Sequence, residues 1–596
     1  MLSALRRERP TLSLLAAVLL QIITVVQAQK EVPSVSDFIR RDRHGSVVLG
    51  DFVYIDGGLL SQNISGALDT IIPRVNNVTL SIDLRRSWTN ATVQLTAIDR
   101  GDTPVLIFPN LWPDAASASF YLWSGMAAPD RTVPNLGLWK FAADGSGGGT
   151  WGKVGQADLA TFNSLTRPAG GYAAVQGDAA YCAGGFHSSA TDPAVDTADE
   201  IPVPGIVVYN FTSGAWTNGS SPTGGFTPHG TEMWGKAASV PFNTRTGGGG
   251  GLLVFVGGES GSQTALSNRV GYLDLDTVAV FDPARRAWYS QVATGDVPSQ
   301  RDGFCLVGAQ DVTAAGANGS YELFLHGGWN AAAGETFNDT YVLSLPAFRW
   351  FRGPDAPARR LGHTCNVVGG AARQFLSIGG SDNTVEIADR WKTADVWKQG
   401  LGVFDMTAMS WSDGYDANAT AYEVPQVVKA WYQSGSEPSW SSDTVKALFA
   451  NETTTTNSSS SSSSSTTTTN HTPAIVGGVV GSIAGLTLLL ALFFLFLLRR
   501  RRRNRRNRNT ALLASPNSAA EAATAASDPN ELPGGDARHE LPEHEVKELP
   551  GDGHKFGAEL PGQRGNAPPA EVDGSPVAAV ELDGGGVGGR TEGRGQ

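Results

Sequence analysis

The sequence predicts an all-β main domain built as a β-propeller, and two observations carry this prediction. An apolar run that ends in a small dipeptide occurs six times, and a tryptophan follows each run about 20–30 residues later. The last glycines of successive runs are 67, 60, 73, 70 and 52 residues apart, so each unit is a small sheet with loops of variable length. One such unit cannot bury its own faces, and the copies must therefore stack around a shared core.

The six apolar runs are predicted to be the second strand of each unit. They are too short for helices and rich in Val, Phe, Tyr and Leu, which suits strands that are buried on both faces. The small residues that follow allow the backbone to approach its neighbours closely. The runs end at Gly58, Gly125, Gly185, Gly258, Gly328 and Gly380.

A hairpin is predicted to follow each of these strands, with the tryptophan on its outer strand. An aromatic residue lies seven positions ahead of Trp216, Trp288 and Trp411, and turn-forming residues lie between the two. The same position recurs in several units, so we expect it to have a packing role. The six tryptophans are Trp88, Trp151, Trp216, Trp288, Trp350 and Trp411.

An inner strand is predicted ahead of each glycine-ended strand. In four units it follows an arginine, namely Arg43, Arg167, Arg301 or Arg360. Four strands per unit and six units make a six-bladed β-propeller. A seventh blade stays open if a degenerate unit lies between Trp88 and Phe120.

The repeat resembles that of the kelch family, whose four-stranded blade has Gly-Gly after the second strand, an aromatic residue on the third and Trp on the fourth. The resemblance covers roughly Arg43 to Trp411 and is weakest in the second copy, where Ser124-Gly125 replaces Gly-Gly. The whole layout is also similar to that of fungal kelch-repeat proteins of the membrane and cell wall. The resemblance implies a propeller that acts as a binding platform.

The chain is predicted to divide into seven segments. Residues 1–28, with arginines, an apolar stretch and a small-residue end, are typical of a signal peptide. An uncharged apolar stretch can cross a bilayer as a helix, and Ser/Thr-rich or Gly/Pro-rich stretches cannot form a core. The remaining segments are the propeller 29–420, a short helical flank 421–450, a Ser/Thr-rich stalk 451–472, a transmembrane helix 473–498, a basic segment 499–509 and a disordered tail 510–596.

Charge predicts the orientation in the membrane. Eight arginines lie within 499–508, whereas no Lys or Arg lies between Lys446 and the apolar span. Positive residues flank the cytosolic end of a span, so we expect a single-pass plasma-membrane or cell-surface protein with its propeller outside. The net charge of −12 and the position of the basic cluster at the membrane give no indication of nucleic-acid binding.

Glycosylation sequons agree with this orientation, since all of them precede the span. The candidate acceptors are Asn63, Asn77, Asn90, Asn210, Asn218, Asn318, Asn338, Asn418, Asn451, Asn457 and Asn470.

Three cysteines, Cys182, Cys305 and Cys365, lie in predicted propeller strands. Their odd number excludes a disulfide scaffold. Aligning RDGFC with RLGHTC offsets Cys305 and Cys365 by one residue, and hence to opposite strand faces. We therefore expect no bridge between these two and interpret the cysteines as buried apolar side chains.

An enzymatic alternative follows from the resemblance, because galactose oxidase carries a copper site on a kelch propeller. Copper-radical chemistry needs two imidazoles, tyrosines and a cysteine close together. The candidate imidazoles lie one per unit or loop without a recognisable copper motif, and His326 and His363 are expected to pack within their strands. These imidazoles are His44, His187, His229, His326 and His363.

The function predicted from the sequence is therefore cell-surface binding, sensing or adhesion through a protein or glycan ligand, with no cofactor and no catalytic residues. The alternatives are an extracellular copper-radical carbohydrate oxidase and a structural cell-wall spacer.

Two motifs outside the propeller suggest partners. Gly477, Gly481 and Gly485 lie four residues apart on one face of the predicted span, which favours a homodimer through close helix packing. A repeated Glu-Leu-Pro in the tail suggests a docking motif for a cytosolic partner. Its copies begin with Glu531-Leu532, Glu540-Leu541, Glu548-Leu549 and Glu559-Leu560.

Overall fold

The computed structural model describes residues 32–69, 71–128, 131, 133, 137–219, 231–242, 251–261, 271–311 and 319–449. The predicted signal peptide, stalk, span, basic segment and tail lie outside these residues. No helix within the described ranges is long and apolar enough to cross a membrane.

Six sheets, each of four successive antiparallel strands, form the main body of the described chain. In every sheet the strands follow one another in chain order, as expected for units with short local connections. The strands of the first three sheets are β2 (Gly45–Leu49), β3 (Phe52–Asp56), β7 (Val78–Asp83) and β9 (Leu95–Asp99); β10 (Leu106–Asp114), β11 (Ser119–Ala127), β12 (Trp139–Ala143) and β13 (Gly149–Lys153); β14 (Tyr172–Gln176), β15 (Ala179–Ala183), β18 (Ile206–Asn210) and β19 (Trp216–Gly219). Those of the last three are β20 (Lys236–Val240), β21 (Leu252–Val256), β24 (Thr277–Asp282) and β25 (Ala287–Val292); β27 (Cys305–Gln310), β28 (Tyr321–His326), β31 (Thr340–Leu345) and β32 (Arg349–Arg352); β33 (Thr364–Val368), β34 (Gln374–Ile378), β35 (Leu401–Asp405) and β36 (Ser410–Ser412).

Short strands and helices connect or flank these sheets. A small sheet of β1, β4, β5 and β6 lies beside the first sheet in the sequence, and β26 adds a parallel strand to the fifth. The short elements are β1 (Phe38–Asp42), β4 (Leu59–Ile64), β5 (Ala67–Leu68), β6 (Arg74–Val75), β8 (Trp88–Thr89), β16 (Phe186–His187), β17 (Ile201–Pro202), β22 (Glu259–Ser260), β23 (Gly271–Tyr272), β26 (Thr294–Gly295), β29 (Trp329–Asn330), β30 (Glu335–Thr336), β37 (Gly414–Tyr415), η1 (Ala115–Ser117), α2 (Leu159–Ser164), α3 (Ile387–Arg390) and η2 (Lys398–Gly400).

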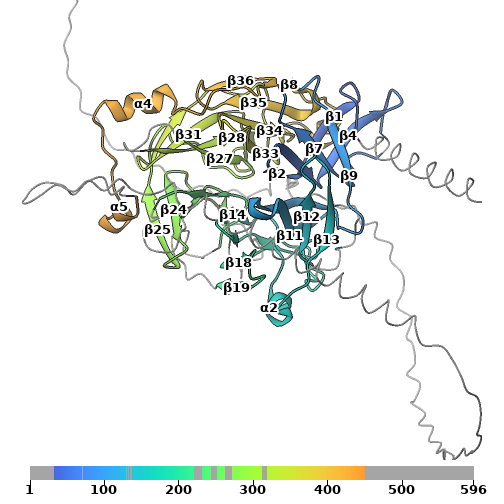
Figure 1. Ribbon diagram of the computed structural model, residues 1–596, viewed down its shortest axis with the longest axis horizontal. Helices are drawn as coiled ribbons and strands as arrows, with labels where there is room; N and C mark the ends of the chain where they lie inside the picture. Colours follow the sequence, from blue (N-terminus) through green and yellow to red (C-terminus); the bar gives the residue numbers. More distant parts are fainter. Residues whose placement is uncertain are drawn as a thin grey trace, which may run out of the picture. The chain divides into compact units, whose positions relative to one another are not determined.

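The six sheets are arranged as a ring. The first strand of each sheet contacts the first strand of the next, and β33 of the last sheet contacts β2 of the first. Figure 1 shows β2, β14, β27 and β33 near the centre, with β13, β19, β25 and β36 at the periphery. This all-β arrangement is consistent with a β-propeller, and its cores lie between neighbouring sheets.

One backbone hydrogen bond recurs at every junction of the ring. The N–H of the last glycine of each apolar run donates, at 2.7–3.0 Å, to a carbonyl just ahead of the next sheet or, at Leu106, in the first residue of that sheet. The glycine is required because its φ is positive and an added Cβ would collide with backbone, for example 2.6 Å from Asp42 O at Gly58. The donor–acceptor pairs are Gly58–Leu106, Gly125–Pro168, Gly185–Glu232, Gly258–Arg301, Gly328–Arg360 and Gly380–Arg41, the last of which joins the sixth sheet to the first.

The predicted hairpins are confirmed in five of the six units. The residue seven positions before the tryptophan lies directly opposite it across the two outer strands, as in Phe281 and Trp288. The second unit reaches the same pairing, Phe141 with Trp151, through its longer loop. The other pairs are Tyr209–Trp216, Leu343–Trp350 and Phe404–Trp411.

The first unit departs from the predicted pattern. Trp88 lies in β8, which pairs with β37, and the outer strand of the first sheet is β9. The ring of Trp88 packs on that of Tyr415 at 5.4 Å, so this tryptophan helps to join the two ends of the ring. Residues between Trp88 and Phe120 supply β9 and β10, and no separate sheet forms there.

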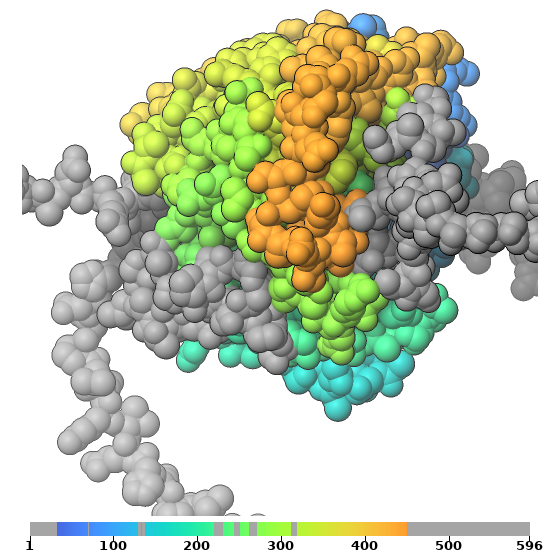
Figure 2. Space-filling model, turned by 90° about the vertical axis from the view of Figure 1, so that its left-hand side faces the viewer, coloured from blue at the N-terminus to red at the C-terminus, as the bar shows by residue number. Residues whose placement is uncertain are grey.

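The predicted helical flank 421–450 contains two short helices, α4 (Gln426–Gln433) and α5 (Asp443–Phe449). Val428 of α4 packs against the fifth and sixth sheets, and Leu448 and Phe449 of α5 pack against the fourth and fifth. Figure 2 shows this C-terminal segment, in orange, lying along the outside of the green and yellow-green sheets. The helices therefore cover junctions between sheets and contribute no strand to the ring.

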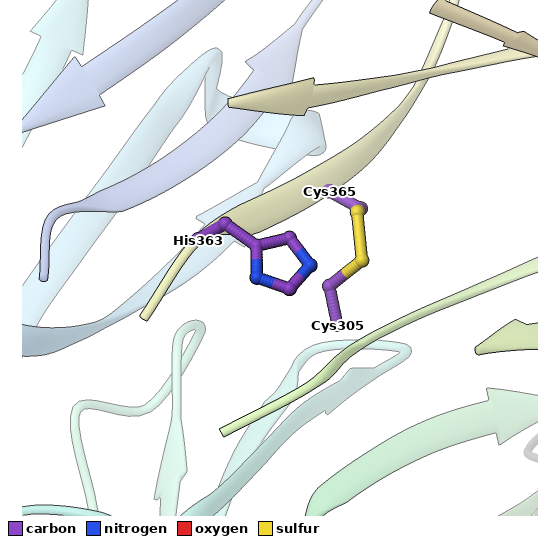
Figure 3. A group of neighbouring side chains, drawn as sticks. All are labelled: Cys305, His363 and Cys365. Atoms are coloured by element: carbon purple, nitrogen blue, oxygen red, sulfur yellow. A yellow bond between two sulfur atoms is a disulfide. The ribbon is translucent and has the colours of Figure 1, made fainter. Parts of the chain in front are cut away.

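Cys305 and Cys365 are joined by a disulfide with Cα atoms 5.6 Å apart, so the expectation that they stay unbridged is wrong (Figure 3). The one-residue offset is real: Cys305 pairs with His326, the residue before its glycine pair, whereas Cys365 lies one position beyond the equivalent Thr364. Neighbouring sheets of the ring face each other, however. Cysteines on opposite strand faces of adjacent sheets therefore point toward each other, and the offset favours the bridge. Cys182 is buried and free, as expected.

Candidate functional site

Six residues with left-handed backbone surround the axis of the ring; five lie two positions ahead of a first strand, and Phe108 lies within β10. Their φ angles lie between 51° and 67°. Five hydrogen bonds of 2.7–3.3 Å connect their peptide groups, each N–H donating to a carbonyl of an adjacent member. We call this set the axial ring; its members are Arg43, Phe108, Gly170, Trp234, Gly303 and Gly362.

A cavity of about 70 Å³ lies beside the axial ring. That volume holds a few water molecules or the tip of one side chain. The start of the first strand of each sheet, or the segment just ahead of it, contributes to the wall, so closure of the ring brings the wall together. Its lining residues are His44, Phe108, Pro109, Asn110, Gly170, Gly171, Trp234, Gly235, Lys236, Gly303, Gly362, His363 and Thr364.

Three members of the axial ring carry large side chains, and these contact one another. The rings of Phe108 and Trp234 meet edge to face at 4.8 Å, and the Arg43 guanidinium lies 5.3 Å from the Phe108 centroid. A Cβ on Gly170 would lie 2.9 Å from the indole of Trp234, so glycine leaves the space that the indole occupies. All three side chains are partly exposed, and together they form the Arg43–Phe108–Trp234 cluster.

The basic groups beside the cavity are held toward their neutral forms by burial. Burial lowers the pKa of His44 to about 3 and that of His363 well below its ordinary value. Burial also lowers the pKa of Lys236, against the opposing effect of the Asp302 carboxylate. The imidazoles are therefore neutral at physiological pH and available as hydrogen-bond acceptors or metal ligands.

Buried arginines lie close to the junctions between sheets, near the backbone hydrogen bonds that the glycines donate. Arg301 pairs with Asp339 at 2.5 Å, and the Nη2 of Arg360 lies 3.2 Å from Asp395. In the first sheet the equivalent residue is Arg41, because its carbonyl accepts the junction hydrogen bond from Gly380. The assignment of Arg43 to this position is therefore wrong by two residues.

At two of the other junctions, the residue whose carbonyl accepts the hydrogen bond has a buried ionisable side chain without such a pair. The three guanidinium nitrogens of Arg41 have no hydrogen-bond partner within the described residues, and burial lowers the pKa of Arg41 to about 10. In the fourth sheet the junction carbonyl belongs to Glu232, a buried carboxyl group. These two positions hold ionisable side chains that burial disfavours in their charged forms.

Glu232 makes stability depend on pH in a defined direction. Burial raises the pKa of its carboxyl from 4.5 to about 8. The native state therefore retains a proton that the unfolded chain releases, and its stability falls as pH rises from about 4.5 to about 8. We expect Glu232→Gln to flatten this slope and to raise the melting temperature at pH 8, measured by thermal unfolding across that range. The matched change Glu437→Gln, at an exposed site, should leave the slope unchanged, and an unaltered slope in Glu232→Gln would contradict the assignment.

The predicted glycosylation sites differ in solvent exposure. Asn77, Asn218 and Asn418 are exposed, and Asn63, Asn210 and Asn338 are half-buried. Asn90 is 3% exposed and its Nδ2 donates to Leu401 O at 2.9 Å, so a glycan there would disrupt the fold. Glycosylation stays a prediction at the other sites. Asn318, Asn451, Asn457 and Asn470 lie outside the described residues.

Two of the candidate histidines lie together, although they come from different units as expected. The rings of His326 and His363 are 5.1 Å apart, and both residues are buried. His187 is half-buried in β16, and His44 borders the cavity. His229, the glycines of the predicted dimer face and the Glu-Leu-Pro motifs fall outside the part of the chain that the structure describes.

The Arg43–Phe108–Trp234 cluster was not found from the sequence. Only the glycines at three of the six axial positions repeat, and the three large side chains share no residue type. Counting back two residues from the first strand would have aligned five of the six positions, but this needs the strand boundaries, and Phe108 lies inside β10.

Comparison with known proteins supports the repeat assignment. The chain is similar to a kelch repeat-containing protein of Arthroderma benhamiae, with 24% identity over 469 residues that cover 70% of this chain. The match spans 66% of that relative, just under two thirds of its length. No protein-family model matches the chain. Together with the ring of small antiparallel sheets, the similarity supports a kelch-type repeat.

Proposed function

We propose that this chain is a six-bladed kelch-type β-propeller that binds a protein ligand through the Arg43–Phe108–Trp234 cluster. One observation carries the proposal: three bulky side chains occupy left-handed backbone positions that glycine fills in the other three sheets. Left-handed backbone costs roughly 1–2 kcal/mol for a residue with a Cβ. The axial ring itself needs no such side chains, so their retention points to a ligand.

The chemistry of the cluster suits a protein ligand. Its aromatic faces and guanidinium are the side-chain types enriched at the centres of protein interfaces. The cavity beside them is small, so we expect it to admit one anchoring side chain of the partner rather than a whole small molecule. The similarity to a kelch repeat-containing protein agrees with binding as the activity.

Glycine substitution offers a sharp test, because glycine is the residue found at the equivalent positions. We expect Arg43→Gly, Phe108→Gly and Trp234→Gly each to weaken binding at least ~10-fold while the far-ultraviolet circular dichroism stays native. The assay uses the full chain on arrays of immobilised peptides and immobilised glycans. Arg86→Ala, at an exposed turn, serves as the control.

Two outcomes would contradict this proposal. Equal peptide binding by wild type and all three glycine variants would remove the cluster from the site. Binding to glycans alone would replace the protein ligand with a carbohydrate.

We further propose that the propeller is displayed at the cell surface by the predicted span 473–498, after secretion directed by residues 1–28. The charge asymmetry about the span and the sequons ahead of it support this orientation. The tail would then carry the Glu-Leu-Pro motifs to a cytosolic partner, and the glycine face of the span would favour a homodimer. Protease treatment of intact cells should remove the propeller and leave the tail; retention of the intact chain would contradict the orientation.

A further inference from the structure

Two neighbouring junctions of the ring contain the same arrangement of three side chains. Between the sixth and first sheets, Ser46 Oγ donates to Thr364 Oγ1 at 2.5 Å, and His44 Nε2 lies 2.9 Å from the same Thr364 oxygen. Thr364 is the first residue of β33, and Ser46 and His44 flank the first residue of β2. A histidine at this position therefore reaches the start of the preceding sheet's first strand.

Between the fifth and sixth sheets, sulfur replaces oxygen in this arrangement. Cys305 begins β27 as Thr364 begins β33, Cys365 corresponds to Ser46, and His363 corresponds to His44. A ring nitrogen of His363 and both sulfurs lie within 4.8 Å of one another. Figure 3 shows the imidazole beside the disulfide.

The imidazole of His363 has no hydrogen-bond partner for either nitrogen within the described residues, although the side chain is only 3% exposed. A buried polar group without a partner is costly, so a buried unpartnered imidazole indicates a missing ligand. The equivalent His44 obtains its partner from the Thr364 hydroxyl. His363 faces sulfurs that are bonded to each other and cannot donate.

We propose that reduction of the Cys305–Cys365 disulfide creates a zinc site whose ligands are the two sulfurs and a ring nitrogen of His363. A phosphine reductant supplies the two electrons and is oxidised to the phosphine oxide. Water supplies the oxygen and two protons, which yield two thiols. Binding of Zn²⁺ then releases both thiol protons and forms two Zn–S bonds.

Several features favour Zn²⁺ at this position. Two thiolates and one imidazole are typical zinc ligands, with Zn–S near ~2.3 Å and Zn–N near ~2.0 Å. Two thiolate charges neutralise the dication, so the buried site carries no net charge. The neutral His363 can coordinate through its unprotonated ring nitrogen without losing a proton. His363 also lines the cavity beside the axial ring, and we expect a water molecule from that side to supply the fourth ligand.

The test measures zinc bound by the purified full chain. The protein is reduced with a water-soluble phosphine, desalted without oxygen, equilibrated with Zn²⁺ and analysed for metal content. We expect reduced wild type to hold about one more zinc per chain than oxidised wild type. Co²⁺ in place of Zn²⁺ should give the absorption bands of cobalt–thiolate bonds.

Two matched variants distinguish zinc bound at this site from zinc bound elsewhere on the protein. Cys305→Thr combined with Cys365→Ser reproduces the neighbouring Thr364–Ser46 arrangement and should abolish the extra zinc while the protein still folds. His363→Phe introduces the residue found at this position in the fifth sheet, Phe304, and should weaken zinc binding at least ~10-fold. The proposal fails if reduced wild type binds no more zinc than the double variant, or if it unfolds on reduction without binding zinc.

Discussion

Trp350→Ala is expected to destabilise the propeller by about 3–5 kcal/mol, the usual range for loss of a buried tryptophan. Trp350 is 0% exposed, and its Nε1 donates to Leu275 O at 2.9 Å. The indole thus fills the core between the fourth and fifth sheets and also satisfies a carbonyl just ahead of β24 in the fourth sheet. Urea unfolding of the full chain, followed by near-ultraviolet circular dichroism, measures the loss.

The matched control is Trp288→Ala, which lies at the same repeat position in the fourth sheet. Trp288 is half-buried and packs on Phe255 and Phe281, so its loss should cost less than that of Trp350. Equal losses at the two positions would show that burial does not set the energy of the repeated tryptophan. A native unfolding curve for Trp350→Ala would contradict its structural role.

Arg360→Met is expected to cost about 3–5 kcal/mol, because it removes the nearer of the two guanidinium groups beside the buried Asp395 carboxylate and leaves only that of Arg40, at 3.9 Å. The side chains of Arg360 and Asp395 are each 1% exposed, and the guanidinium also lies 4.1 Å from the Trp397 ring. Methionine keeps most of the packing volume, so the loss reports the charge. Urea unfolding at pH 7 provides the measurement.

Arg41→Met is the matched comparison. Arg41 occupies the equivalent position at the junction between the sixth and first sheets, and its guanidinium has no hydrogen-bond partner among the described residues. Removal of an unpaired buried charge should be neutral or stabilising. If Arg41→Met and Arg360→Met lower the free energy of unfolding by similar amounts, then Arg41 has a partner of its own. That result would contradict the assignment of Arg41 as an unpaired buried charge.

His363 of the proposed zinc site and Trp234 of the ligand cluster both line the cavity beside the axial ring. Different variants test the zinc site and the ligand cluster. The glycine variants leave the cysteines unchanged, and the cysteine variants leave the Arg43–Phe108–Trp234 cluster unchanged.

Local patterns in the sequence determined the strands and their order. Short apolar runs, turn-forming residues and the seven-residue spacing to tryptophan act within one unit, so they identified the second, third and fourth strands correctly in five units. The first unit failed because Trp88 pairs with residues more than three hundred positions away, in β37. No local pattern reports such a contact.

Only the tertiary structure decided what lies between the sheets. The Cys305–Cys365 bridge, the approach of His326 to His363 and the axial ring all depend on how one sheet faces the next. The predicted one-residue offset of the two cysteines is correct, and it puts them on opposite strand faces. Because the two strands belong to facing sheets, this offset favours the bridge instead of preventing it. Repeats reveal what each unit does alone, whereas this candidate site is built from the positions at which the units differ.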